Sequence, residues 1–117
     1  MRSLLAVVLL ALLPLAHAVN PDSPEGRRIE YLITSVETLK DAEFIRNDST
    51  YGAKAAGDHL RLKLKSAGSR VATAEDFIRL CASGSSVSGK PYRIRFADGH
   101  EVTSEEFLRA RLNDLAR

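Results

Sequence analysis

The sequence predicts a small, mainly α-helical domain of the α+β class, with about four helices and one short strand or hairpin before the last helix. Three observations support this prediction. Apolar residues recur at helical spacing in four segments, and they alternate with polar residues in only one segment, residues 92–96. The chain has 117 residues, which is enough for one domain with a modest core and excludes a multidomain enzyme or a repeat array.

The first 18 residues have the pattern of a secretory signal peptide. A positive start precedes an unbroken apolar run over residues 4–13, and Ala16-His17-Ala18 matches a cleavage site. The alternative, a membrane-spanning helix, needs about 20 apolar residues, roughly twice the length of this run. We therefore expect cleavage after Ala18 and no transmembrane anchor after it. No cysteine lies near this site, so a lipid anchor is not expected.

The remaining chain is predicted to consist of a flexible leader, residues 19–24, and a single domain, residues 25–117. The domain is predicted to open with a helix over residues 25–41. Ser23 and Pro24 are typical of a helix start, because a Ser hydroxyl caps free backbone N–H groups and Pro fits the first turn. The apolar stripe of this helix consists of Ile29, Leu32, Ile33, Val36 and Leu39.

A second helix is predicted over residues 53–67, with Gly68 as its C-terminal stop. Before it, Asn47-Asp48-Ser49 has the composition of a turn. Gly57 lies inside the predicted helix, where a glycine costs about 1 kcal/mol relative to alanine. We expect this glycine to allow close packing against the first helix.

A third helix over residues 74–83 begins at a capping box that starts with Thr73. Residues 92–96 alternate between apolar and basic side chains, which predicts a strand with one buried face. Asp98-Gly99 is a strong tight-turn signal, so any hairpin there is short. A complete capping box then predicts a final helix over residues 104–115.

Composition excludes several classes of function. The balance of 17 basic and 15 acidic residues argues against a nucleic-acid partner. The single cysteine, Cys81, has no second thiol to pair with within the chain. It lies near the end of a predicted helix, where a thiolate is disfavoured, so we interpret it as a buried structural residue, with an intermolecular disulfide as the alternative. His59 and His100 show no metal-ligand spacing, and we expect no metal ion and no cofactor.

Residues 84–90, GSSVSGK, match the letters of a phosphate-binding loop. Such a loop follows a strand and opens a helix, and Ser or Thr comes after its Lys. Here a predicted helix precedes the segment, a predicted strand follows it, and residue 91 is Pro. We interpret the segment as a Ser/Gly hinge, or as a small anion-binding nest formed by its backbone amides and the hydroxyls of Ser85, Ser86 and Ser88.

Polar residues concentrated in two loops and on the predicted helix 53–67 form the candidate binding surface. Its members are Arg46, Asn47, Tyr51, His59, Lys63, Ser86, Ser88 and Tyr92. His59 and Lys63 are four residues apart and therefore share one helix face. Arg61, Lys65 and Arg70 could form a basic edge, and Arg93 and Arg95 point to one side of the predicted strand. We interpret these basic residues either as a solvated, salt-bridged face or as a contact for anionic envelope material.

Several segments carry a family resemblance when they are taken together. They are Phe44-Ile45-Arg46-Asn47, Tyr51, His59-Leu60 with Lys63, residues 73–78, Ala82-Ser83, and residues 88–92. In this order they resemble the YfeK-like family, a domain of unknown function in small exported proteins of Gram-negative bacteria. The resemblance covers about residues 29–115 and implies a periplasmic location, but no activity, substrate or catalytic residue. It also implies that Glu43 and Phe96, which stand where relatives carry a disulfide, are spatial neighbours.

We therefore expect a non-enzymatic periplasmic module that binds a protein or an anionic component of the cell envelope. One alternative is a small hydrolase or transferase that acts on envelope polymers with His59 as general base. Another alternative is a periplasmic folding or stress accessory protein. A concave pocket with a Ser or carboxylate beside His59 would favour the enzyme, whereas a flat face or an apolar groove would favour the binding module.

Overall fold

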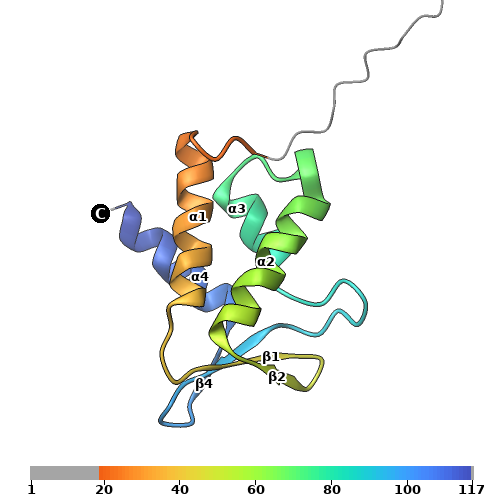
Figure 1. Cartoon of the computed structure of the whole chain (residues 1–117), viewed down its shortest axis with the longest axis vertical. Helices are drawn as coiled ribbons and strands as arrows, with labels where there is room; N and C mark the ends of the chain where they lie inside the picture. Colours follow the sequence, from red (N-terminus) through yellow and green to blue (C-terminus); the bar gives the residue numbers. More distant parts are fainter. Residues whose placement is uncertain (1–18, 117) are drawn as a thin grey trace, which may run out of the picture.

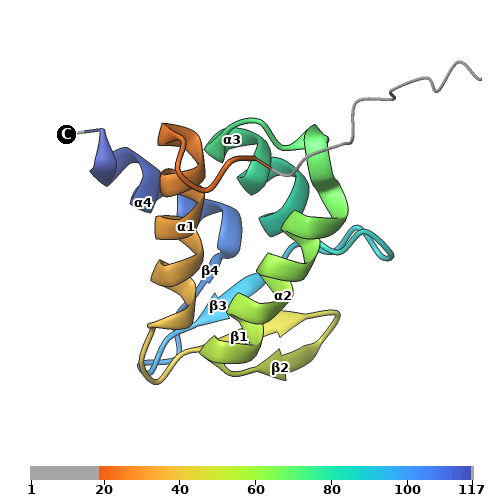
Figure 2. The same ribbon diagram turned by 45° about the horizontal axis from the view of Figure 1, so that its top comes forward.

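The computed structural model describes residues 19–116 and confirms a small α+β domain with four α-helices and an antiparallel sheet. The signal peptide expected over residues 1–18 lies outside the described residues. The helices stand over one face of the sheet (Figure 1), and this arrangement is clearest in the tilted view (Figure 2). Within residues 19–116, no helix is long and apolar enough to cross a membrane.

Helix α1 (Pro24–Glu37) begins where the sequence predicts. The Ser23 hydroxyl accepts a hydrogen bond from the backbone N–H of Gly26 at 3.0 Å, which satisfies one of the free donors of the first turn. Residues of the expected leader form a turn against this helix start, because Asn20 O accepts hydrogen bonds from both the backbone N–H and the hydroxyl of Ser23. Gly26 is required there, since a Cβ would overlap the Asn20 carbonyl.

The end of α1 corrects the sequence prediction. A helix over residues 25–41 was expected, but α1 ends at Glu37. The chain leaves the helix at Thr38 and turns through Asp41, whose φ of 55° is in the left-handed region. Leu39 still packs against the core, so its position continues the apolar spacing of α1 after the backbone has left the helix.

The structure contains a hairpin that the sequence did not predict. It consists of β1 (Glu43–Arg46) and β2 (Ser49–Tyr51), which pair in antiparallel register. The turn between them was predicted, and Asn47 and Asp48 adopt φ values of 50° and 65° in it, as a two-residue hairpin loop requires. The strands were missed because they are short and because two adjacent residues of β1 are buried, so no alternation is visible.

The sheet has the order β2-β1-β3-β4, with β3 (Arg93–Arg95) and β4 (Glu101–Thr103). Strand β3 confirms the centre of the strand expected over residues 92–96. Phe44 lies opposite Ile94 on the face that the helices cover. Glu43 lies opposite Arg95, so positions 43 and 96 are neighbours along the ladder, although their side chains point to opposite faces of the sheet.

Helix α2 (Ala53–Ala67) has the predicted bounds and packs closely on α1. A Cβ built at Gly57 would lie 2.8 Å from the Cβ of Glu37, so the predicted role of this glycine is confirmed. A 3₁₀ turn, η1 (Gly68–Arg70), follows α2.

Helix α3 (Ala74–Phe77) continues into a π-helical turn, η2 (Ile78–Ala82), and the two together confirm the helix expected over residues 74–83. Helix α4 (Ser104–Leu115) matches its prediction and packs on α1 and η2. The centre of the core consists of Leu32, Ile33, Phe77, Ile78, Ile94 and Leu108. Cys81 is buried beside them, and this burial raises the pKa of its thiol, as expected for a structural cysteine.

Candidate functional site

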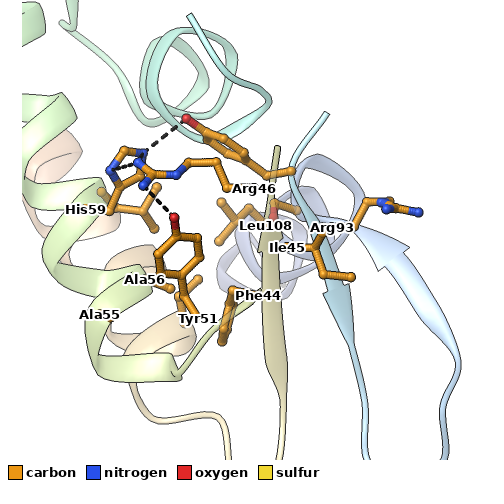
Figure 3. A pocket seen from close by; sticks show the side chains of 13 residues that line it. Phe44, Ile45, Arg46, Tyr51, Ala55, Ala56, His59, Arg93 and Leu108 are labelled. Atoms are coloured by element: carbon orange, nitrogen blue, oxygen red, sulfur yellow. Dashed lines mark hydrogen bonds between the residues drawn. The ribbon is translucent and has the colours of Figure 1, made fainter. Parts of the chain in front are cut away.

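An apolar cavity of about 180 Å³ lies between α2 and the sheet, and we name it the inner cavity. Its apolar walls include Val36 from α1, Phe44 from β1, Ala56 and Leu60 from α2, and Leu108 from α4. Polar side chains line it as well, and they reach toward one another between the hairpin and α2 (Figure 3). The cavity is therefore mostly apolar, with a hydrogen-bonding group at one side.

That polar group is a hydrogen-bonded cluster, which we name the Arg46 cluster: Arg46, Tyr51, His59, Lys63 and Tyr92. Arg46 reaches from β1 and donates from Nη1 to Nδ1 of His59 at 2.9 Å and from Nη2 to the hydroxyl of Tyr51 at 2.9 Å. His59 Nε2 lies 3.1 Å from the hydroxyl of Tyr92. These contacts fit a neutral imidazole that accepts at Nδ1 and donates from Nε2. Figure 3 shows the guanidinium lying between the imidazole and the Tyr51 ring.

Lys63 lies one helical turn beyond His59 on α2. Its Nζ donates to the Tyr92 hydroxyl and to the Gly84 carbonyl, each at 3.0 Å, and it lies 5.0 Å from the centroid of the Tyr92 ring. The Tyr92 oxygen thus accepts hydrogen bonds from two side chains. Its own hydrogen is left to donate to a further group.

The charge of this cluster is not balanced by acids. Among residues 19–116, Arg46 and Lys63 form no ion pair with a carboxylate, and their hydrogen-bond acceptors are neutral. Burial lowers the pKa of His59, and the two neighbouring cations lower it further, because each disfavours a third positive charge. The hydrogen bond that Arg46 donates also lowers the pKa of the Tyr51 phenol, since it stabilises the phenolate form.

A wider cleft of about 360 Å³, which we name the outer cleft, lies beside the inner cavity and shares Arg46, His59 and Tyr92 with it. Its further lining comes from α2, η1, η2 and the loop after η2. The cations on its surface are Arg46, Lys63 and Arg70, and no Asp or Glu is among the described residues that line it. Leu62 and Val87, which also line the cleft, are 62% and 95% exposed, so its edge is apolar.

The 84–90 loop follows a helix and leads toward β3, as predicted, but it is an ordered, closed loop rather than a hinge. Gly84 bridges to Pro91, and the Ser85 N–H donates to the Lys90 carbonyl at 3.0 Å. The buried Ser85 hydroxyl accepts from the backbone N–H groups of Val87 and Ser88. The amides of Val87 and Ser88 are therefore not free to form the predicted anion-binding nest, because the Ser85 hydroxyl already accepts from them.

The structure gathers the predicted candidate residues at one place. Five of them form the Arg46 cluster. Asn47 and Ser88 lie next to it, where the Ser88 hydroxyl donates to Asn47 Oδ1 and Asn47 Nδ2 donates to the Ser85 hydroxyl at 3.2 Å. Ser86 lines the outer cleft. Sequence reasoning did not place Leu62 or Val87 in the site, because an isolated exposed apolar residue carries no functional signal until its neighbours are known.

The arrangement is suited to binding an anion. Arg46 and Lys63 present N–H donors with unneutralised charge, and Tyr92 supplies a free O–H donor in a partly desolvated cleft. His59 has its Nδ1 occupied by the Arg46 guanidinium, which weakens it as a general base. Within residues 19–116, no group of three or more His, Cys, Asp or Glu side chains is arranged to hold a metal ion.

Comparison with known proteins identifies the family of this chain. A family of unknown function, DUF5329, matches residues 23–116, which is nearly all of the described chain. The chain belongs to this family. It is 38% identical over 92 residues to the uncharacterized protein YfeK of Salmonella typhimurium, covering 79% of this chain and 77% of that protein. The resemblance to YfeK-like proteins is therefore confirmed. No solved structure matches the chain.

Proposed function

We propose that this protein is a binding module of the bacterial periplasm and that its ligand carries an anionic group, which is held in the outer cleft. The observation that supports the proposal most directly is the cluster of Arg46 and Lys63 with only neutral hydrogen-bond acceptors. Two such cations side by side repel each other and are partly shielded from water. A bound anion relieves both costs, because its negative charge attracts both cations and gives their N–H groups an ionised acceptor.

A weaker alternative is a hydrolase that uses His59 as its base. The imidazole lies beside a cavity, as such an enzyme would need, but its hydrogen-bond partners are Arg46 and Tyr92 rather than a Ser or a carboxylate. Both neighbouring cations also oppose the protonation that a general base must undergo. The same features favour anion binding, so the binding module is the better supported proposal.

The binding proposal is tested by titrating the domain, residues 19–117, with inorganic phosphate and with acetate while recording ¹H–¹⁵N NMR spectra. We expect saturable shifts at the backbone amides around the outer cleft. Arg46→Gln and Lys63→Gln should each weaken binding about tenfold, which corresponds to losing one charge-assisted hydrogen bond. Lys65→Gln, an exposed cation on the same helix, is the matched control and should change binding less than about twofold. Shifts that are absent, or that fall equally in all three variants, would contradict the proposal.

Export is proposed on the basis of the N-terminal sequence alone. When the full chain is expressed in a Gram-negative host, we expect it in the periplasmic fraction, with a mass that corresponds to a first residue of Val19. A full-length product that stays in the cytoplasm would exclude this location.

A further inference from the structure

Residues of the Arg46 cluster also line the apolar inner cavity. A ligand bound by the cluster therefore lies next to apolar walls, and this position indicates its chemistry. We propose that the ligand is an anionic amphiphile, in which an apolar group of about six carbons enters the inner cavity while its carboxylate or phosphate is held by Arg46. This proposal rests on the proposed function, since it names the chemistry of the ligand at the same site. It adds that the apolar cavity behind the cations is part of that site.

The size of the cavity sets the size of the apolar group. The inner cavity has a volume of about 180 Å³ and is walled by Val36, Phe44, Ala56, Leu60 and Leu108. A dry cavity of about 150 Å³ lined by Leu, Ile and Phe is large enough to bind benzene. The inner cavity therefore accommodates a phenyl ring or a six-carbon acyl chain. A long fatty acyl chain would exceed it.

The polar side of the cavity supplies the head-group contacts. Arg46, His59 and Tyr92 line both the inner cavity and the outer cleft, so an anion that meets Arg46 is already next to the apolar walls. Arg46 now donates to two neutral acceptors, a ring nitrogen of His59 and the Tyr51 hydroxyl. A carboxylate or phosphate that replaces one of them gives the guanidinium a charged acceptor, which is the stronger hydrogen bond.

The charge of the surroundings favours an anion over a neutral or cationic amphiphile. Lys63 and Arg70 line the outer cleft with Arg46, and no Asp or Glu is among the described residues around it. Elsewhere on the molecule, Arg61, Arg93 and Arg95 each have a carboxylate partner. The cations beside the cavity thus differ from these three arginines in having no carboxylate partner among the described residues.

The experiment compares small probes that carry the anionic head group, the apolar chain, or both. Acetate carries the head alone, hexanoate adds four methylenes, hexan-1-ol carries the chain without the charge, and hexyl phosphate changes the head. Dissociation constants are measured by NMR titration of the domain, residues 19–117. Each fully buried methylene raises affinity about fourfold, so four of them could raise it about 200-fold. We therefore expect hexanoate to bind at least about tenfold more tightly than acetate, even if the chain is only partly buried. Hexan-1-ol should bind at least about tenfold more weakly than the better of the two six-carbon anions.

Two substitutions separate the cavity from the head-group site. Ala56 lines the inner cavity but not the outer cleft, so Ala56→Leu should fill the cavity and reduce the affinity for hexanoate to that for acetate. Acetate binding should stay unchanged in this variant, which also shows that it is folded. Arg46→Gln should weaken hexanoate and hexyl phosphate about tenfold and leave hexan-1-ol unchanged, with Lys65→Gln as the matched control.

The outcomes distinguish this inference from the proposed function. If acetate and phosphate bind in the outer cleft but hexanoate binds no more tightly than acetate, the amphiphile is excluded and the anion-binding module stands. An undiminished preference for hexanoate in Ala56→Leu likewise excludes the inner cavity as the chain site. If no anion binds, both proposals fail. Tight binding of hexanoate or of hexyl phosphate supports the inference, and the tighter of the two identifies the head group.

Discussion

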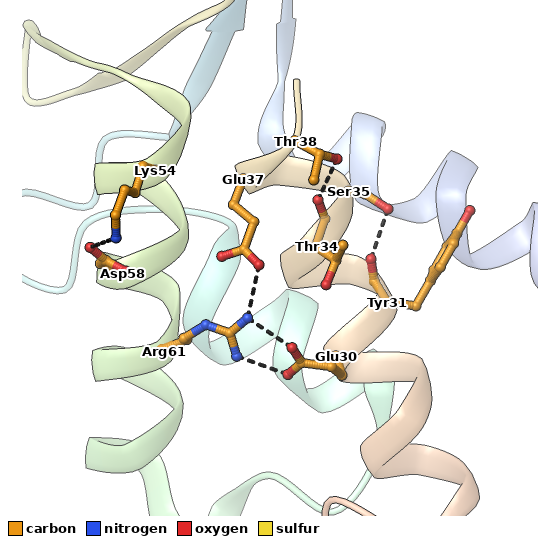
Figure 4. A network of polar contacts seen from close by, with 9 residues as sticks. All are labelled: Glu30, Tyr31, Thr34, Ser35, Glu37, Thr38, Lys54, Asp58 and Arg61. Carbon is orange, nitrogen blue, oxygen red and sulfur yellow. Dashed lines mark hydrogen bonds and ion pairs between the residues drawn. The ribbon is translucent and has the colours of Figure 1, made fainter. Parts of the chain in front are cut away.

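Helix α2 presents a cation on each of its two flanks. One of them has carboxylate partners, and the other has only neutral hydrogen-bond acceptors. On the flank toward α1, Arg61 donates two hydrogen bonds to Glu30, each 2.8 Å long, and a third to Glu37 at 3.0 Å (Figure 4). On the flank toward the hairpin, Lys63 meets only a carbonyl and a phenol. The two residues are next-but-one neighbours in sequence, so the difference comes from what the fold places opposite them.

The comparison separates a cation whose charge is neutralised by ion pairs, Arg61, from a cation whose charge is not neutralised, Lys63. The Glu30 and Glu37 carboxylates raise the pKa of Arg61, and the Arg61 guanidinium lowers the pKa of Glu30. The charges on this flank therefore neutralise one another. The Lys63 flank keeps positive charge next to a cavity. The α1 flank is therefore expected to respond to mutation through stability, and the Lys63 flank through binding.

The largest expected effect on stability is at Gly57, where α2 and α1 approach each other. Gly57→Ala places a methyl group 2.8 Å from Glu37 Cβ, so the helices must separate. We expect the free energy of unfolding to fall by up to about 2 kcal/mol, because overpacking costs about 1–3 kcal/mol and the better helix propensity of alanine offsets about 1 kcal/mol of it. Urea denaturation measures the change. Asp58→Ala, at the exposed neighbouring position, serves as control and should stay within about 0.5 kcal/mol. A variant that is more stable than wild type by about 1 kcal/mol, the full gain in helix propensity, would disprove the close packing.

A smaller effect on stability is expected when Arg61 is replaced on the flank of α2 that faces α1. Arg61→Gln should reduce the free energy of unfolding by about 0.5–1 kcal/mol, since the ion pairs are partly exposed and are screened by solvent. The difference from wild type should shrink in high salt. Acetate binding should be unchanged, in contrast to Lys63→Gln, which should weaken acetate binding about tenfold and keep its stability. Loss of binding in Arg61→Gln would remove the distinction between the two flanks.

The smallest expected effect is a pH dependence of stability that arises from His59, which lies one helical turn before Lys63 on α2. Its pKa is lowered in the folded protein by burial and by the cations Arg46 from β1 and Lys63 from α2, while Tyr92 contacts the other ring nitrogen. The unfolded chain therefore binds a proton more readily than the folded one. This contribution to stability is fully present above about pH 6.5, the ordinary pKa of His, and is lost as the pH falls from there through the folded pKa.

Two measurements check this behaviour. NMR titration of the imidazole should place the pKa of His59 below about 6.5, the ordinary value of a histidine side chain. His59→Gln should flatten the decline of stability between pH 7 and pH 5 relative to wild type. A bound anion at Arg46 should raise the pKa of His59, because it cancels part of the neighbouring positive charge. A His59 pKa at or above about 6.5 in the absence of an anion would show that the cluster is not arranged as described.

The helices were the most predictable part of the fold. The bounds of α2 and α4 follow from Gly68 and from the Thr103 cap, because caps and stops are local interactions that involve a few neighbouring residues. The β1–β2 hairpin was missed, although its turn at Asn47-Asp48 was recognised. Its strands are too short to show a period, and Ile45 is buried on the face opposite to Phe44. The two strands are therefore defined only by their pairing with each other and by the pairing of β1 with β3.

The candidate residues could be found from the sequence, but their relation to one another could not. Arg46, His59 and Tyr92 are polar residues of three different elements, and hydrogen bonds between them span 13 to 33 positions along the chain. The inner cavity has no sequence signal at all, since a cavity is defined by how well distant side chains fill the space between elements. Arg61 and Arg93 were both predicted to contribute to basic surfaces, yet the fold gives each an acidic partner.

The sequence by itself determined the helices, their caps, the turns and the set of polar residues around the site. These features depend on backbone propensity and on contacts within about four positions, which the order of residues specifies directly. The tertiary structure alone decided which cations are neutralised and where an apolar cavity meets those that are not. Both depend on which side chains from separate elements face one another, and that is fixed only when the helices pack onto the sheet.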